Sequence, residues 1–271
     1  MKVAVLITCH NRKVKTLRCL ESLAAQTAAT HLSVETWLVD DGSTDGTAEA
    51  VRDRFPEINI IPGNGGLYWC QGMRLAWSHA AAVKPDAYIW LNDDVVLEPN
   101  ALTTLERVAL THADSIIVGS CACPASGCRT YGGLRRSGHH PGKIVPIEPS
   151  LTPTRCDTFQ GNIVWVPQSV YERVGALGPY QHAMGDIDYG YRAAGAGIEQ
   201  WIAPGYLGRC APNSKENTWE DPQLPAIARL RKLAGRKALP ASDWWRFCRK
   251  HGGASAPLYF IGPYIRIVRG A

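Results

Sequence analysis

The feature that most constrains the fold is a pair of acidic clusters, each placed directly after an apolar run. Asp41 lies just beyond the run at 34–39, and Asp94 lies just beyond the run at 87–91. An apolar run that ends in carboxylates indicates a buried strand whose carboxyl end reaches the rim of a parallel sheet. Ligands of open α/β sheets bind in the crevice at that rim. A ligand site at this position is therefore expected.

Strand-like and helix-like patterns alternate through the first part of the chain. The expected strands are 3–7, 34–39, 58–61 and 87–91. Between them, apolar residues recur at helical spacing, as Leu17, Leu20, Leu23 and Ala24 do after the first strand. This alternation predicts right-handed crossovers and an α/β fold with a Rossmann-like, mostly parallel sheet flanked by helices.

The alternation weakens after about Ile117. The stretch 122–150 is rich in Gly, Pro, Arg and His and is expected to form a long loop or an irregular hairpin. Strand character returns at 158–166 and at 198–203. Between these two strands, Asp186 and Asp188 form a third acidic cluster at the start of a short helical pattern.

The composition fits a cytoplasmic protein with a sizeable core. The chain has 271 residues, of which 45% are apolar, so one large α/β domain or one domain with an appendage is expected. The nine cysteines are odd in number and mostly lie in apolar surroundings, which is typical of reduced thiols. Three of them cluster at 121–128 without a fourth ligand at zinc-like spacing, which disfavours zinc. The sequence shows neither a signal peptide nor an apolar run long enough to span a bilayer.

The C-terminal part of the chain is basic and aromatic. From Ile227 onward there are ten Lys and Arg residues and one acid, Asp243, and aromatic side chains such as Trp245 and Phe260 lie among them. This segment, expected to be helical, could present a solvated basic face or contact an anionic membrane at the inner face of the plasma membrane. A nucleic-acid partner is not expected, because no nucleic-acid-binding motif is present.

The loop after the first strand, residues 8–13, excludes the common phosphate-binding loops. It contains neither a Gly-x-Gly-x-x-Gly fingerprint nor a Walker A sequence. A nucleotide would therefore meet side-chain carboxylates, which repel phosphates unless a divalent cation lies between them. Mg²⁺ is commonly held by one or two carboxylates and the substrate phosphates, and Asp93 with Asp94 could supply such carboxylates.

Four segments resemble family 2 glycosyltransferases. They are 6–12, 39–47 (with Asp-Asp-Gly-Ser-Thr-Asp-Gly-Thr), 91–95 (Leu-Asn-Asp-Asp-Val) and 184–192 (Met-Gly-Asp-Ile-Asp-Tyr-Gly-Tyr-Arg). The resemblance covers about residues 2–208 and implies the GT-A fold. It divides the chain into a GT-A domain at 1–215, with a nucleotide-sugar-binding half at 1–115 and an acceptor-side half at 116–215, followed by a helical basic C-terminal segment at 216–271.

The resemblance also implies a donor site and a metal. The donor would be a UDP- or dTDP-sugar, and Asp94 would coordinate Mg²⁺ or Mn²⁺ on its diphosphate. The residues that would contact the nucleotide sugar are Thr8, His10, Asn11, Asp41, Asn64, Gly66 and Asp93.

The resemblance also implies a reaction that inverts the anomeric carbon of the sugar. Asp186, or alternatively Asp188, would deprotonate a hydroxyl of a saccharide or lipid-linked acceptor in cell-surface polysaccharide assembly. The chain departs from the family pattern at two positions. Gly185 stands where the family often has Glu, and Asn92 stands where the family has the first Asp of its Asp-x-Asp motif. The family also often carries a metal-ligating His after the last core strand, and this chain has none around residues 208–213.

Two other functions remain compatible with these patterns. A sugar nucleotidyltransferase also uses an α/β nucleotide domain with Mg²⁺, but it should carry a Gly-rich basic loop where residues 8–13 lie. A non-catalytic nucleotide-sugar-binding protein is the second alternative, and the departures at Gly185 and Asn92 are compatible with it.

Overall fold

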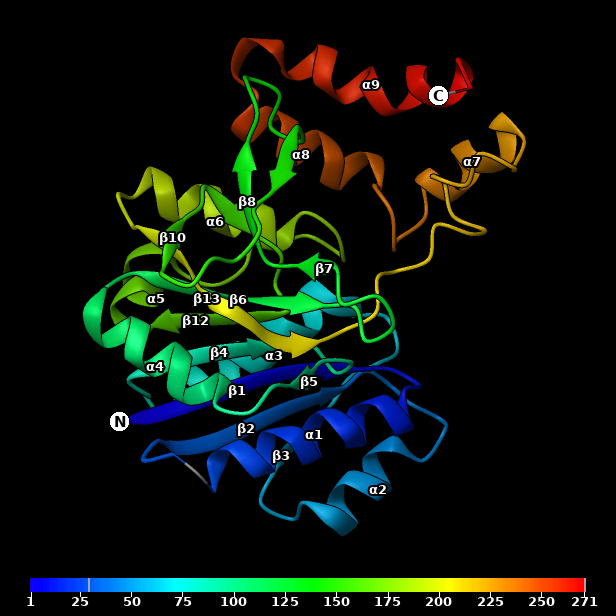
Figure 1. Ribbon diagram of the computed structural model, residues 1–271. Coiled ribbons are helices and arrows are strands. Elements are labelled where there is room, and N and C mark those ends of the chain that lie inside the picture. The colour runs from blue at the N-terminus through cyan, green and yellow to red at the C-terminus, as the bar shows by residue number, and fades with distance from the viewer. Residues whose placement is uncertain (29, 271) are drawn as a thin grey trace.

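The computed structural model describes residues 1–28 and 30–270, and a ten-stranded sheet with helices on both faces forms its centre (Figure 1). The main path of this sheet is β10-β13-β6-β12-β4-β1-β2-β3, with β5 beside β13 and β7 beside β6. A second sheet of three strands has the order β11-β8-β9. The strands are β1 Lys2–Cys9, β2 Ser33–Asp40, β3 Asn59–Pro62, β4 Ala87–Leu91, β5 Val96–Leu97, β6 Ile116–Ala122, β7 Arg129–Tyr131, β8 Gly133–Arg136, β9 Ile144–Pro146, β10 Thr154–Arg155, β11 Thr158–Phe159, β12 Ile163–Pro167 and β13 Gln200–Arg209.

The first four strands form the parallel part of the sheet. β1 pairs in parallel with both β2 and β4, and β2 pairs in parallel with β3. Their carboxyl ends therefore meet along one edge, as the acidic clusters at these ends predict. The predicted α/β architecture and the expected strands at 3–7, 34–39, 58–61 and 87–91 are confirmed.

β12 runs in the opposite direction between β4 and β6. Because it is reversed, its beginning rather than its end reaches the edge where β4 ends. There the Asn92 backbone N–H donates to the Asn162 carbonyl at 3.0 Å. In the stretch 122–150, predicted as a long loop or irregular hairpin, β8 and β9 form a short antiparallel pair.

Helices lie on both faces of the main sheet and in the C-terminal segment. They are α1 Lys13–Thr27, α2 Thr47–Arg54, α3 Tyr68–Ala81, α4 Ala101–Thr111, α5 Gln168–Val174, α6 Gly185–Gly195, α7 Ala226–Leu233, α8 Ala241–His251 and α9 Ala256–Val268, with a 3₁₀ turn at Gly253–Ser255. Alternate side chains of β1 point to opposite faces of the sheet. Val5 packs in the core between the sheet and helices α1, α2 and α4, and Leu6 packs in the core on the face of α3 and α6. α3 lies so close to β1 that a Cβ at Gly72 would approach Thr8 Cβ to 2.9 Å.

The C-terminal segment packs onto the α6 side of the molecule. Trp244 and Phe247 of α8 are buried in the same core cluster as Tyr189 of α6. α9 lies outside α8, farthest from the sheet (Figure 1). Within residues 1–28 and 30–270, none of the helices has both the length and the apolar content needed to cross a bilayer.

Candidate active site

The loops after β1 and β2 are held together by hydrogen bonds at the carboxyl edge of the sheet. His10 Nδ1 lies 2.6 Å from the Asp41 carbonyl oxygen. Asn11 adopts a left-handed backbone conformation with φ of 50°, and its Oδ1 accepts from the Thr44 backbone N–H at 2.7 Å. The Asn11 N–H in turn donates to Ser43 Oγ. Two of the predicted nucleotide-binding residues, His10 and Asn11, therefore also fix the conformation of their own loops.

The carboxylate of Asp41 holds the loop that follows β3. Its Oδ1 accepts from the Gly65 N–H at 2.8 Å, and its Oδ2 accepts from the N–H groups of Leu67 and Tyr68, both at 2.9 Å. Asn64 Oδ1 accepts from the Gly66 N–H within the same loop. The structure therefore brings Asp41, Asn64 and Gly66 together at this edge of the sheet.

Arg12 joins the loop after β1 to the acidic pair after β4. Its Nη1 donates to Asp93 Oδ1 at 2.8 Å and to Asp94 Oδ2 at 3.1 Å, and Lys15 Nζ lies 3.9 Å from the same Asp94 oxygen. Burial raises the pKa of Asp93 to about 6, although the positive charge of Arg12 opposes that rise. The pair is therefore a partly desolvated anionic centre beside fixed cations.

The oxygens that Arg12 leaves unbound fit a divalent cation. Asp93 Oδ2 is buried without a hydrogen-bond partner among the described residues, and Asp94 Oδ1 meets only the thiol of Cys210, at 3.5 Å. Within the same residues, no group of three or more His, Cys, Asp or Glu side chains is placed to hold a metal. Two carboxylates suit Mg²⁺ or Mn²⁺ only when substrate phosphates complete the coordination.

Trp69, at the start of α3, connects the β4 end to the acceptor side. Its Nε1–H donates to Asn92 Oδ1 at 2.7 Å, and its backbone N–H points to His182 Nδ1 at 3.4 Å. A Cβ at Gly161 would lie 2.6 Å from Trp69 Cζ2 and 3.4 Å from Asp186 Cβ. The indole therefore connects Asn92, the residue before the acidic pair, with Gly161, whose N–H binds Asp186.

Asp186 is held by two backbone donors at the start of α6. Its Oδ2 accepts from the Gly161 N–H at 3.0 Å and its Oδ1 from the Ile187 N–H at 2.8 Å. Burial raises its pKa above the ordinary value, against the lowering effect of those two hydrogen bonds. No cation pairs with this carboxylate among the described residues, so it can accept a proton more readily than an ordinary Asp.

Asp188 has a different environment, although it lies only two residues further on. Its side chain is completely buried, and it binds Arg192 Nε at 2.8 Å, Lys250 Nζ at 2.9 Å and His251 Nε2 at 2.8 Å. The Tyr180 hydroxyl donates to it at 3.0 Å. Although burial alone would raise its pKa, the donors from His251 and Lys250 and the charge of Arg192 hold that pKa well below its usual range.

Gly185, which stands where the family often has Glu, has a steric reason to be glycine. A Cβ at this position would lie 2.5 Å from Cys70 Sγ and 3.3 Å from Cys70 Cβ, because α3 packs closely against the start of α6. A Glu here would have to displace α3. The glycine therefore reflects packing of the helix that carries Asp186.

We expect Gly185→Ala to destabilise the protein by about 1–3 kcal/mol, because the added methyl overlaps a buried thiol. Chemical denaturation would measure the loss. The matched variant Cys70→Gly removes the opposing side chain, so the double variant should recover part of the loss that Gly185→Ala causes alone. Equal effects of Gly185→Ala in both backgrounds would show that Cys70 is not the obstacle.

The C-terminal segment adds cations near the loop after β3. A Cβ at Gly66 would lie 3.7 Å from Arg236 Nη1. His182 is neutral near pH 7, because burial and the charges of Lys237 and Arg12 lower its pKa to about 4. The Gln181 side-chain amide donates to the Gly66 carbonyl at 2.7 Å, and the Gln181 backbone N–H donates to the carboxylate of Asp243 on α8, also at 2.7 Å.

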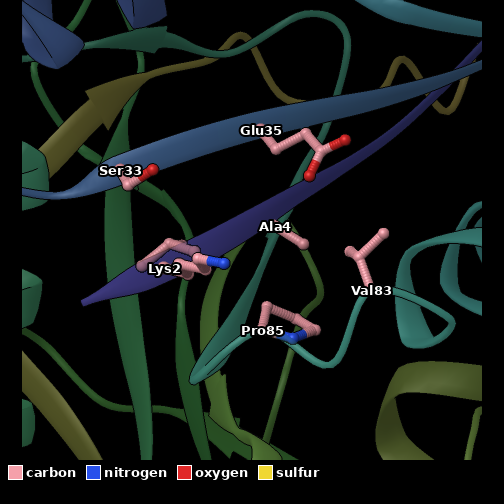
Figure 2. A pocket seen from close by; sticks show the side chains of 7 residues that line it. Lys2, Ala4, Ser33, Glu35, Val83 and Pro85 are labelled. Carbon is pink, nitrogen blue, oxygen red and sulfur yellow. The ribbon is translucent and has the colours of Figure 1, made fainter.

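A hollow of about 110 Å³ lies at the opposite edge of the sheet (Figure 2). Lys2, Ser33 and Glu35 line it at the amino ends of β1 and β2, together with Pro85 from the segment before β4. This volume is too small for a nucleotide sugar, and ligands of α/β sheets bind at the other edge. The hollow is therefore not part of the candidate site.

Several residues that build the site were not assigned from the sequence. Arg12 belongs to the segment 6–12 that resembles the family, but nothing in the sequence indicated that its side chain would bind Asp93. Gln181 and His251 carried no signal, because their partners Gly66 and Asp188 lie on distant elements.

Comparison with solved structures identifies the fold. A mannosyltransferase, PcManGT from Pyrobaculum calidifontis, solved with GDP-Man and Mn²⁺, superposes with a TM-score of 0.59 over 99% of this chain and 73% of that chain, at 14% identity. TarS from S. aureus, solved with UDP-GlcNAc, superposes with a TM-score of 0.60 over 99% and 82%, at 12% identity. The chain therefore has the GT-A fold of glycosyltransferases, as predicted.

The sequence comparison gives the family. The model of glycosyl transferase family 2 matches residues 4–176, and this chain is a member of that family of enzymes. An N-acetylglucosaminyl-diphospho-decaprenol L-rhamnosyltransferase from Mycobacterium tuberculosis is 25% identical to it over 250 residues, which cover 83% of this chain and 81% of the relative.

Proposed function

We propose that this protein transfers a sugar from a UDP- or dTDP-sugar to a saccharide or lipid-linked acceptor, with inversion at the anomeric carbon. The observation that carries the proposal is the arrangement of two unlike acidic centres at one edge of the sheet. One is the Asp93–Asp94 pair, whose free oxygens suit a cation on a diphosphate. The other is Asp186, a carboxylate with a raised pKa that no cation pairs with among the described residues, and Trp69 connects it to the first centre through Gly161 and Asn92.

The donor side would be formed by the loops after β1, β2 and β3. Asp41 Oδ1 accepts one backbone hydrogen bond and keeps a second lone pair for a base N–H or a ribose hydroxyl. Thr8 lies near the end of β1 against Gly72 of α3, and His10 and Asn11 lie in the loop that follows β1. Asn64 and Gly66 lie in the loop that Asp41 holds. Hydrogen bonds between these loops place the binding groups before the substrate arrives, which lowers the entropy lost on binding.

Asp94, with Asp93 beside it, would hold Mg²⁺ or Mn²⁺. The bound cation would act as a Lewis acid, neutralising charge that builds on the diphosphate as it leaves. Arg12 and Lys15 contribute fixed positive charge at the same place and hold the two carboxylates in position.

Asp186 would be the general base. Its carboxylate takes the proton of the acceptor hydroxyl while the oxygen forms a bond to the anomeric carbon and the bond to the diphosphate breaks. The nucleoside diphosphate leaves without a proton, so one base suffices. Asp188 is unsuitable for this step, because its side chain is completely buried and carries four donors.

The similarity to the mycobacterial relative favours a deoxyhexose as the transferred sugar and a lipid-diphosphate-linked sugar as the acceptor. Such an acceptor would place the enzyme in cell-surface polysaccharide assembly at the inner face of the plasma membrane. A direct assay would incubate the protein with UDP- and dTDP-sugars, with and without Mn²⁺ and a synthetic polyprenyl-diphosphate-linked N-acetylglucosamine. Transfer of labelled sugar to the lipid supports the proposal; binding without release of nucleoside diphosphate would overturn it.

We expect Asp94→Asn to lower the transfer rate by about a hundredfold, because the variant loses anionic charge and one ligand where the leaving diphosphate is stabilised. The concentration of Mn²⁺ that gives half-maximal rate should also rise. Asp53→Asn on the exposed surface of α2 makes the same chemical change away from the site and serves as the control. An unchanged Mn²⁺ requirement in Asp94→Asn would remove Asp94 from the metal site.

A further inference from the structure

The outer face of α9 carries an apolar stripe that the rest of the described chain, residues 1–28 and 30–270, leaves exposed. Leu258 and Val268 are each 68% exposed, and Ile261 and Ile265 are 43% and 42% exposed. Spacings of three, four and three residues place these four side chains along one side of a helix. The opposite side is buried, with Ile267 only 1% exposed.

α9 is fixed in place rather than loosely attached. It packs against α8 and α7, and the Trp244 indole N–H of α8 donates to the Phe260 carbonyl of α9 at 3.0 Å. Trp245, which is 39% exposed, meets Phe260 edge to face at 5.4 Å. In Figure 1 α9 forms the outermost layer of the molecule, beyond α8.

The net charge of the C-terminal segment favours an anionic partner. From Ile227 onward the chain has ten Lys and Arg residues against one acid, whereas the preceding residues carry more acids than bases. That single acid, Asp243, is buried and paired with Arg246. Arg266 and Arg269 are exposed in the last turn of α9 and just beyond it. A second copy of the chain is disfavoured, since a two-fold contact through this face would bring two basic surfaces together.

We propose that the outer face of α9 docks on an anionic lipid bilayer, with its four aliphatic side chains in the interfacial region and Arg266 and Arg269 toward the lipid phosphates. Helices with an apolar stripe and basic flanks lie in the plane of such interfaces. Trp245, exposed next to this helix, is a residue type that settles at the headgroup level. The inference rests on α9 and its charges and not on the proposed sugar transfer.

Vesicle flotation with the full chain tests this surface. The protein should float with vesicles of phosphatidylglycerol and phosphatidylcholine, bind phosphatidylcholine alone much more weakly, and lose binding as salt increases. Leu258→Gln combined with Val268→Gln should lower the partition coefficient by about tenfold or more, since less apolar area enters the interface. Removal of Arg266 or Arg269 by substitution with Gln should lower it by about fivefold each.

Leu110→Gln on α4 is the matched control, because Leu110 is 71% exposed on a helix at another part of the surface. It should bind vesicles as the wild type does, and exposed substitutions of this kind leave the fold intact. Equal binding by the α9 variant and this control would overturn the proposal, as would a wild type that stays unbound on anionic vesicles. Self-association that the α9 substitutions abolish, without vesicle binding, would assign the face to a second copy instead. None of these outcomes depends on whether sugar is transferred.

Discussion

Asp186→Asn is expected to lower sugar transfer by about 10²–10⁴-fold, because the amide cannot take the proton of the acceptor hydroxyl. The wild-type carboxylate is suited to that step, since burial raises its pKa and no cation pairs with it among the described residues. Nucleotide-sugar binding should remain, because the residues proposed to bind the donor lie in the loops after β1, β2 and β3 and do not include Asp186. Single-turnover transfer with labelled donor would measure the chemical step, and isothermal titration would measure donor binding.

A control is needed for the fold, since both Asp186 oxygens accept backbone hydrogen bonds, from Gly161 and Ile187. In the variant, the amide NH₂ group faces one of these N–H donors, which costs about 1–3 kcal/mol. Thermal unfolding therefore has to accompany the rate measurement. Full transfer by a folded Asp186→Asn variant would show that the base lies elsewhere.

The pH dependence of the wild type provides an independent check on Asp186. A general base works in its ionised form, so the rate should fall as the pH drops through the raised pKa of this carboxylate. The acidic limb of kcat/KM should then lie above the range of an ordinary Asp. A limb at the ordinary Asp value would contradict the environment that the structure gives to Asp186.

Asp188→Asn is expected to destabilise the protein by about 3 kcal/mol. The substitution leaves the cations Arg192 and Lys250 without their shared, completely buried counter-ion. The expected loss lies at the lower end of the destabilisation found when a buried ion pair is broken, because Lys250 is itself 41% exposed. Chemical denaturation would measure the loss, and limited proteolysis of the segment 210–225 would report loosening of α8 from α6.

Tyr180→Phe is the graded control for this cluster, because it removes one neutral donor to Asp188 and should cost only about 1 kcal/mol. The pH dependence has a defined sign. The low pKa of Asp188 in the folded protein means that its stabilising contribution is complete above the unfolded value of about 3.9 and is lost as the pH falls further. Wild-type stability in Asp188→Asn would show that the α6–α8 contact does not depend on this charge.

The parts of the site that the sequence predicted are those that depend on local patterns. Asp41 and Asp94 follow apolar runs, and a run followed by acids is visible without any knowledge of the fold. The distinction between Asp186 and Asp188 was not predictable, because it depends on Lys250 and His251, which are far along the chain. Only the spacing of Asp188 and Arg192, one helical turn apart, gave a local hint of that ion pair.

The C-terminal segment shows the same limit. Its basic and aromatic composition predicted helices and left a solvated face and a membrane contact open. The sequence did not show that Trp244 and Phe247 would enter the core beneath α6 while Leu258 and Val268 stay outside. Which side of an apolar helix is covered depends on its neighbours in space, and those neighbours are α6 and α8.

The reversed strand β12 has a consequence for how the enzyme can move. It pairs with β4 of the nucleotide-binding half and with β6 of the acceptor-side half, so one ladder of backbone hydrogen bonds crosses the predicted boundary between them. A hinge at this boundary would have to break that ladder. The two predicted halves should therefore move as one body while the substrates bind and leave.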